Sequence, residues 1–328
     1  MRLKTMVAAA MAGVSIAACA AFTVDFDRIQ HWTGEGENRA ALVVQFLDDY
    51  DSKGYVWGFR WKDGEEPTGE TMIRAVAATG KDFCALVQYT GGMGSTLDGV
   101  GYSENNVILD YLAYDYAGAA SDPYVMFAFD TPNEFMGQTK APGEEAASLA
   151  ADAIEAAKET GIIEHPLNAR EFGYPAYDYD WWQPAMTSAD MRWNAGWYTG
   201  YWSYWLGAAT IPVEEYSYSG LGMSSVKLKD GDVNAWKFMS LNGPVNPDDF
   251  VDGVTNASTP WATSLDYEHF GITSSEVIEI LSRADAETEI YTLDGQRAGT
   301  FAKGEKLSLH PGIYIARSAG KSKKIYVR

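Results

Sequence analysis

The chain has 328 residues, and its 45 acidic residues outnumber its 25 lysines and arginines, which gives a formal net charge of −20 at pH 7. This charge excludes nucleic-acid binding, because neutralising phosphates takes clustered lysine and arginine, and it excludes peripheral binding to anionic lipid for the same reason. Tyrosine, tryptophan and glycine are abundant, at 20, 11 and 32 residues. Since aromatic residues favour strands and glycine favours turns, we expect an α+β, sheet-rich fold.

The N-terminus has the features of a secretory signal peptide, which we predict at residues 1–20. Basic residues precede an apolar run over residues 6–18 that is too short to span a bilayer and ends in small residues. Two cleavage sites fit this segment. Residues 16–19 (IAAC) resemble a bacterial lipobox, which would make Cys19 a lipid anchor, whereas residues 18–20 (ACA) fit ordinary cleavage between small residues.

Residues 21–165 are predicted to form an N-terminal α+β module. Strand-length apolar runs alternate with two segments of helical spacing, the first of which begins after the N-capping Thr68 and ends at Gly80. The expected elements are strands at 40–47, 55–61, 83–89 and 124–130 and helices at 68–80 and 143–161. In the strand at 55–61 (YVWGFRW) the four large aromatic residues share one face, because side chains alternate along a strand.

Residues 166–268 are predicted to form an aromatic-rich β module. The stretch from Trp181 to Trp205 holds six of the eleven tryptophans. Residues 165–207 show no regular period, so this part is expected to be irregular. Two or three strands joined by glycine turns are expected over residues 214–239, and a loop rich in Pro, Asn, Asp and Gly at 242–260 indicates a boundary.

The tryptophan-rich stretch has two interpretations, a packed core and a stacking site for a flat ligand. Trp181 and Trp182 are neighbours that face opposite sides if they lie on a strand, so part of this set is expected to be exposed or to line a cleft. Arg192 could stack on a ring or clamp an anionic ligand group, with a solvated strand position as the competing interpretation. The candidate ligand-binding residues are Trp181, Trp182, Trp197, Tyr201 and Arg192, with Trp57 and Trp61 as outer candidates.

The sequence contains no G-x-S-x-G elbow, H-E-x-x-H pair, P-loop or dinucleotide fingerprint. Its four histidines lack metal-ligand spacing to another His or Cys, so no metal and no cofactor is predicted. They are His31, His165, His269 and His310. A glycosidase pair such as Asp130 with Glu134 can be drawn, but so many carboxylates allow many such pairs. We therefore expect a binding protein, with a glycoside hydrolase and a structural surface protein as alternatives.

The tail, residues 272–328, has short alternating strands with turns between them, as in a small β-sandwich. Strands are expected at 276–280, 288–292, 312–316 and 324–328. Residues 290–297 (IYTLDGQR), 311–315 (PGIYI) and the basic ending 321–328 resemble the C-terminal sorting domains of the type IX secretion system of Bacteroidota. The resemblance implies that the secretion machinery is a partner of this tail. It also implies an extracellular or outer-membrane surface location in a Gram-negative bacterium.

A second resemblance concerns residues 200–238, which combine an aromatic strand, a glycine turn and the Asp-Gly-Asp turn at 230–232. They resemble the C-terminal β-domain of the cobalamin carriers transcobalamin and intrinsic factor, which implies a cobamide as the small-molecule ligand. On chemistry alone a glycan fits as well, since stacked aromatic rings with Asp and Asn serve sugars. The body from residue 22 to about 267 also resembles uncharacterised exported bacterial proteins, through 55–61 and 68–72, and this implies no activity.

Overall fold

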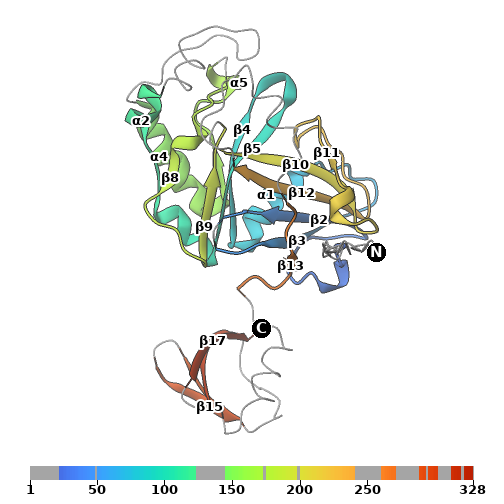
Figure 1. Cartoon of the computed structure of the whole chain (residues 1–328), viewed down its shortest axis with the longest axis vertical. Helices are drawn as coiled ribbons and strands as arrows, with labels where there is room; N and C mark the ends of the chain where they lie inside the picture. Colours follow the sequence, from blue (N-terminus) through green and yellow to red (C-terminus); the bar gives the residue numbers. More distant parts are fainter. Residues whose placement is uncertain are drawn as a thin grey trace, which may run out of the picture.

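The computed structural model describes residues 22–48, 50–122, 145–172, 175–197, 200–240, 260–270, 288–292, 295–301, 312–318 and 321–327. Several sheets and few helices make up this part of the chain (Figure 1), so the expected α+β, sheet-rich class is confirmed. The predicted signal peptide with Cys19 and the strands expected at 124–130 and 276–280 lie outside the described residues. No described helix is long and apolar enough to cross a membrane.

The first sheet joins strands from both ends of the body, in the order β1-β3-β2-β12-β10-β11, with β13 also paired to β3. Its strands are β1 (Trp32–Gly34), β2 (Asn38–Gln45), β3 (Lys53–Trp61), β10 (Gly200–Ala208), β11 (Ser217–Tyr218), β12 (Asp232–Ser240) and β13 (Ser264–Asp266). The central strand β12 runs parallel to β2 and antiparallel to β10. The sheet therefore depends on pairing between segments that are far apart in the sequence.

The second sheet has the order β7-β4-β5-β9 and lies beside the first (Figure 1). Its strands are β4 (Phe83–Tyr89), β5 (Ser95–Ser103), β7 (Ile162–Glu164) and β9 (Met191–Ala195). A short antiparallel pair, β6 (Leu112–Tyr114) with β8 (Trp182–Pro184), stands next to it. The nine-residue strand β10 and the strand β9 correct the expectation that residues 165–207 are irregular.

The helices match their sequence signals. Helix α1 (Gly69–Gly80) begins at Thr68, whose side chain and that of Thr71 form a reciprocal capping box, and it ends where Lys81 takes a left-handed backbone. Helix α4 (Glu145–Thr160) agrees with the helix expected at 143–161. The short helices are α2 (Tyr116–Ser121) and α5 (Ala169–Phe172), with 3₁₀ turns η1 (Phe26–Arg28), η2 (Gly91–Met93), η3 (Glu104–Asp110), η4 (Tyr179–Trp181) and η5 (Val213–Glu215).

Three apolar cores explain where the aromatic residues go. The central core lies between the two sheets and α1, and it takes Tyr55, Trp57, Phe59 and Trp61 from one face of β3. A second core covers the far face of the second sheet, against α4, and a third covers the far face of the first sheet. Because both sheets are buried on both faces, alternation along a strand here sends neighbours into two different cores instead of one core and solvent.

The body is a single layered unit, which corrects the predicted division into modules 21–165 and 166–268. β12 pairs with β2 and β9 pairs with β5, so both sheets contain strands from each side of the predicted boundary. Each predicted module would leave a sheet edge unpaired without the other. Composition indicates that boundary, but composition does not report which strands pair.

The described part of the tail forms one four-stranded antiparallel sheet in the order β15-β14-β16-β17. Its strands are β14 (Thr288–Thr292), β15 (Arg297–Phe301), β16 (Gly312–Ser318) and β17 (Lys321–Val327). Strands were expected at three of these positions. The second layer of the predicted sandwich over 272–328 is not among the described residues, and no described strand of this sheet pairs with a strand of the body.

Candidate functional site

The predicted ligand-stacking residues lie mostly in the cores. Trp57, Trp61, Trp182 and Trp197 are buried, with exposed fractions between 0 and 8%. Trp181 and Tyr201 are partly buried and pack against the second core. Trp182 and Trp197 are thus packed in a core, while Trp181 and Tyr201 keep the partial exposure that was expected for part of this set.

The candidates also do not gather in one place. Trp57 and Trp61 belong to the central core between the sheets. Trp182 and Trp197 belong to the core beyond the second sheet, where Trp182 stacks on Tyr114 with ring centroids 4.9 Å apart. A single ligand cannot reach both groups without unpacking the second sheet.

One aromatic edge stays accessible where β10 meets β11. Tyr218 and Leu221 have exposed fractions of 38% and 60%, and the hydroxyl of Tyr218 is hydrogen-bonded to that of Tyr201. Tyr201 in turn stands edge-on to Trp197, with ring centroids 6.0 Å apart. We call Tyr201, Tyr218 and Leu221 the β10–β11 edge; it connects part of the predicted set to solvent.

Arg192 is buried, which corrects the alternative of a solvated strand position. Its guanidinium pairs with Asp51 at 2.9 Å and with Asp48 at 3.5 Å. Burial raises the pKa of Asp48, whereas for Asp51 the hydrogen bonds from the Lys53 backbone and Arg192 outweigh burial and lower the pKa. The rings of Tyr50 and Tyr55 lie 5.5 Å from the guanidinium carbon. The clamp predicted for a ligand anion is thus engaged by the protein's own carboxylates.

His165 and Asp178 form a fully buried pair on the second core. His165 Nε2 lies 2.7 Å from Asp178 Oδ1, and the hydroxyl of Tyr114 donates to Oδ2 at 2.5 Å. The backbone N–H of Leu167 donates to His165 Nδ1 at 3.1 Å, so Nε2 carries the ring proton and the ring is neutral. Burial raises the pKa of Asp178, but the two partners outweigh it and hold that pKa below its usual value. With zero exposure on both side chains, the pair serves packing.

His31, Asp82 and His269 form a cluster that the sequence pattern did not reveal. Their potential metal-ligating atoms all lie within 4.8 Å of one another. Burial raises the pKa of Asp82, but the hydrogen bond from His269 and the neighbouring charges outweigh burial and lower it. Spacing rules look for ligands a few residues apart, whereas these three come from the start of the body, the end of α1 and the turn after β13. Within the described residues this cluster is the set that could hold a metal.

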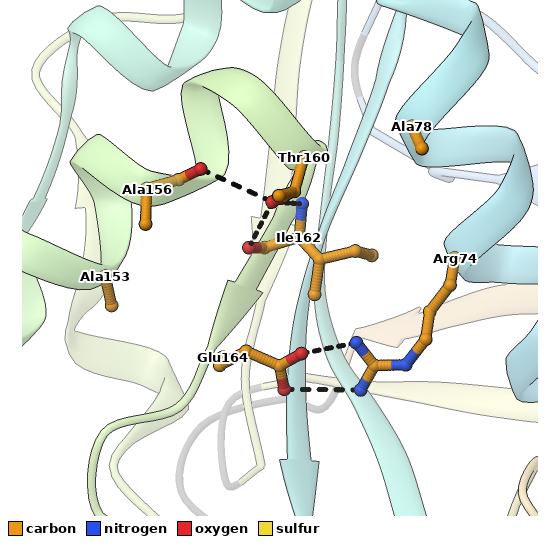
Figure 2. Close-up of a pocket in the computed structure, with 7 residues that line it drawn as sticks. All are labelled: Arg74, Ala78, Ala153, Ala156, Thr160, Ile162 and Glu164. Atoms are coloured by element: carbon orange, nitrogen blue, oxygen red, sulfur yellow. Dashed lines mark hydrogen bonds and ion pairs between the residues drawn. The ribbon is translucent and has the colours of Figure 1, made fainter.

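A groove of about 350 Å³ lies between α1, α4 and β7 (Figure 2). Three alanines, Ala78, Ala153 and Ala156, make its walls. Gly161, which follows α4, has a left-handed backbone, and a Cβ at this position would lie only 2.5 Å from the carbonyl oxygen of Ala77. Figure 2 shows the guanidinium of Arg74 bonded twice to the carboxylate of Glu164. Because these charges satisfy each other, the groove offers a small apolar contact surface and no unpaired charge.

No protein family, curated protein or solved structure matches this chain.

Proposed function

We propose that this chain is an exported binding protein of the outer-membrane surface or extracellular space of a Gram-negative bacterium, with a cobamide or a glycan as its small-molecule ligand. One observation supports the proposal most. The described tail strands complete a sheet of their own and share no strand pairing with the body. A tail built this way can be recognised by a secretion machinery, here the type IX system through residues 272–328, without disturbing the body.

The chemistry of the body favours binding over catalysis. A catalytic acid or base needs a substrate within hydrogen-bond reach. Of the described pairs, His165 with Asp178 is fully enclosed, while Arg192 with Asp51 and Arg74 with Glu164 are engaged with each other. These pairs hold segments together, which is what a stable binding scaffold requires.

The ligand site is best sought at the β10–β11 edge. This edge contains the solvent-accessible part of the predicted aromatic set, and β10 is the aromatic strand on which the resemblance to the cobalamin carriers rests. Tyrosine rings there supply flat apolar area together with a hydroxyl, which suits a corrin ring or a sugar. Trp197 backs Tyr201 and keeps its ring in place.

Calorimetric titration of the chain from residue 22 onward with cyanocobalamin tests the ligand. We expect micromolar or tighter binding that weakens at least about tenfold in Tyr218→Ala, a loss of about 1.4 kcal/mol. Tyr111→Ala is the matched control, since Tyr111 is 40% exposed and lies outside the edge. Binding that is equally weak in both variants would reject the edge. No binding of cyanocobalamin, followed by binding on a glycan array, would replace the cobamide with a sugar.

A structural surface protein is the second candidate, favoured by the burial of Trp57, Trp61, Trp182 and Trp197. In that case neither ligand class binds and each tryptophan contributes only to stability. Deleting residues 272–328 tests delivery independently of the ligand. We expect the truncated chain to remain folded, as followed by circular dichroism, and to stay inside the outer membrane of the native host; release that equals that of the full chain would reject the sorting role.

A further inference from the structure

The cluster of His31, Asp82 and His269 converges on one carboxylate oxygen. His269 Nδ1 lies 2.6 Å from Asp82 Oδ2, and His31 Nδ1 lies 3.9 Å from the same atom. Asp82 stands between α1 and β4, His31 precedes β1, and His269 follows β13. The fold thus brings two imidazole nitrogens and a carboxylate to a single point from three separate segments.

The opposite ring nitrogens fix which way the lone pairs point. His269 Nε2 lies 2.9 Å from the carbonyl oxygen of Val56, and His31 Nε2 lies 3.2 Å from that of Glu268. A carbonyl oxygen only accepts, so each Nε2 carries a hydrogen; Nδ1 of His269 then either holds the proton of its 2.6 Å contact with Asp82 or, once that proton leaves, presents a lone pair. Two lone pairs and a carboxylate directed at one point repel each other unless a cation lies among them.

We propose that His31, Asp82 and His269 bind a divalent transition-metal ion, with zinc as the best match. Two imidazole nitrogens and one carboxylate oxygen form a ligand set that zinc favours, and a backbone carbonyl that accepts from the far ring nitrogen, as Val56 does for His269, is the usual support of such a ligand. Zinc bonds of about 2.0–2.1 Å place tetrahedral ligand atoms about 3.3 Å apart. The observed separations of 2.6 and 3.9 Å lie on either side of that value.

Binding requires one ring to turn. The rings of His31 and His269 are stacked with centroids 4.1 Å apart and planes 5° apart, whereas a metal has to lie near the plane of both rings. His269 has a fully buried side chain, while His31 is 18% exposed and has the longer carbonyl contact. We therefore assign the rotation to His31, which also gives the ion its path from solvent.

The surroundings hold the other two ligands in place. Trp57 Nε1 donates to Asp82 Oδ1 at 3.1 Å, which leaves Oδ2 directed at the histidines. Asp266 Oδ1 accepts the backbone N–H groups of Glu268 and His269. His269 has a φ of 55°, a left-handed conformation that is unfavourable for a non-glycine residue. Backbone strain of this kind persists at functional sites where the surroundings enforce it.

Calorimetric titration of the chain from residue 22 onward with zinc chloride, with metal analysis after desalting, tests the site. We expect one zinc per chain with sub-micromolar affinity. His31→Gln should weaken binding at least tenfold while keeping the far-ultraviolet circular dichroism of the parent, because His31 is the partly exposed ligand. His310→Gln is the control, since it removes one of the four histidines and leaves the cluster intact.

Asp82→Asn provides a second variant that preserves side-chain volume and the acceptor for Trp57. It should also weaken zinc binding at least tenfold. Cobalt(II) gives a separate readout, since a visible absorption band of tetrahedral type should appear with the parent chain and be lost in both variants. Substoichiometric zinc, equal affinity in His31→Gln and the parent, or an equal loss in His310→Gln would overturn the proposal; the cation among these groups is then a proton.

Discussion

Two buried histidine–aspartate pairs in this molecule have nearly equal lengths and opposite surroundings. His165 lies 2.7 Å from Asp178, and His269 lies 2.6 Å from Asp82. The second nitrogen of His165 accepts from a backbone N–H, whereas that of His269 faces a backbone carbonyl. The first pair is therefore complete with a neutral ring, and the second calls for an extra cation. The difference between a packing pair and a candidate metal site thus rests on one backbone group, the N–H of Leu167 beside His165 and the carbonyl of Val56 beside His269.

Asp178→Ala should have the largest effect. It leaves His165 Nε2 and the Tyr114 hydroxyl without their acceptor where neither His165 nor Asp178 is exposed, and we expect the free energy of unfolding to fall by about 3–5 kcal/mol. Asp82→Ala removes the acceptor of Trp57 Nε1 and the partner of His269 Nδ1, but a ring nitrogen that carries no hydrogen needs no acceptor, so we expect about 1–3 kcal/mol. Urea unfolding at pH 7 compares the two. An equal or larger loss for Asp82→Ala would remove the distinction between the pairs.

Tyr114→Phe should have the next largest effect. It removes one hydrogen bond to the ionised Asp178 while keeping the ring that stacks on Trp182, and a bond to a charged group contributes about 1.5–3 kcal/mol. Tyr111→Phe is the matched control, because Tyr111 is exposed and should change stability little. Thermal unfolding of both variants gives the measurement, and the first pair would not be a closed unit if their melting temperatures agreed.

The pH dependence of the unfolding free energy of Asp98→Asn tests the electrostatics around the first pair. Burial, then the nearby charge of Asp178, raises the pKa of Asp98 well above its usual value, and Asp98 Oδ2 has no hydrogen-bond partner among the described residues. An acid whose folded pKa is raised loses stability as pH rises from about 3.9 through the folded value. Asparagine is never charged, so we expect the variant to be about 1–3 kcal/mol more stable at pH 8 and little changed at pH 3.

Asp178 should act in the opposite direction in the same titration. Its lowered pKa means that its contribution is present above the unfolded value of about 3.9 and is lost as pH falls through the folded value. Unfolding free energies of the parent and Asp98→Asn from pH 3 to 8 separate the two carboxylates. A constant difference between the curves at every pH would show that Asp98 does not titrate in this range.

His31→Gln without added metal should have the smallest effect. Its Nδ1 is 3.9 Å from Asp82, a separation at which a partly exposed pair contributes about 0–1 kcal/mol. We expect an unfolding free energy within about 1 kcal/mol of the parent by urea titration in the presence of a chelator. A loss comparable to that of Asp178→Ala would make His31 part of the packing and not a movable ligand.

Local signals predicted local structure well. Thr68 indicated the start of α1 because its capping bonds are made within four residues, and the strand at 83–89 was predicted from its own apolar run. Burial on both faces of the sheets was not predictable in this way. Val56 and Trp57 are neighbours in two different cores, and no pattern in 53–61 distinguishes that arrangement from one wet face.

The sites depended on contacts between distant segments. Arg192 is paired with Asp51 across 141 residues, and His269 reaches Asp82 across 187. Neither separation follows from residue spacing. For His269, the pairing of β13 with β3 is what brings the residue to the end of α1. The sequence shows the composition of the aromatic stretch but not the segments against which its side chains pack.

The central place of β12 has a consequence for synthesis. β2 is complete at Gln45, yet the strand that lies against it begins only at Asp232, so the first sheet cannot close until most of the body has been made. Pairing between such distant segments is slow because a long loop must be closed first. A nascent chain that ends before Asp232 leaves bare edges on β2 and β10, and an unpaired edge invites aggregation. The first sheet can therefore be completed only after the segment that forms β12 has been made, whatever the earlier strands have already paired with.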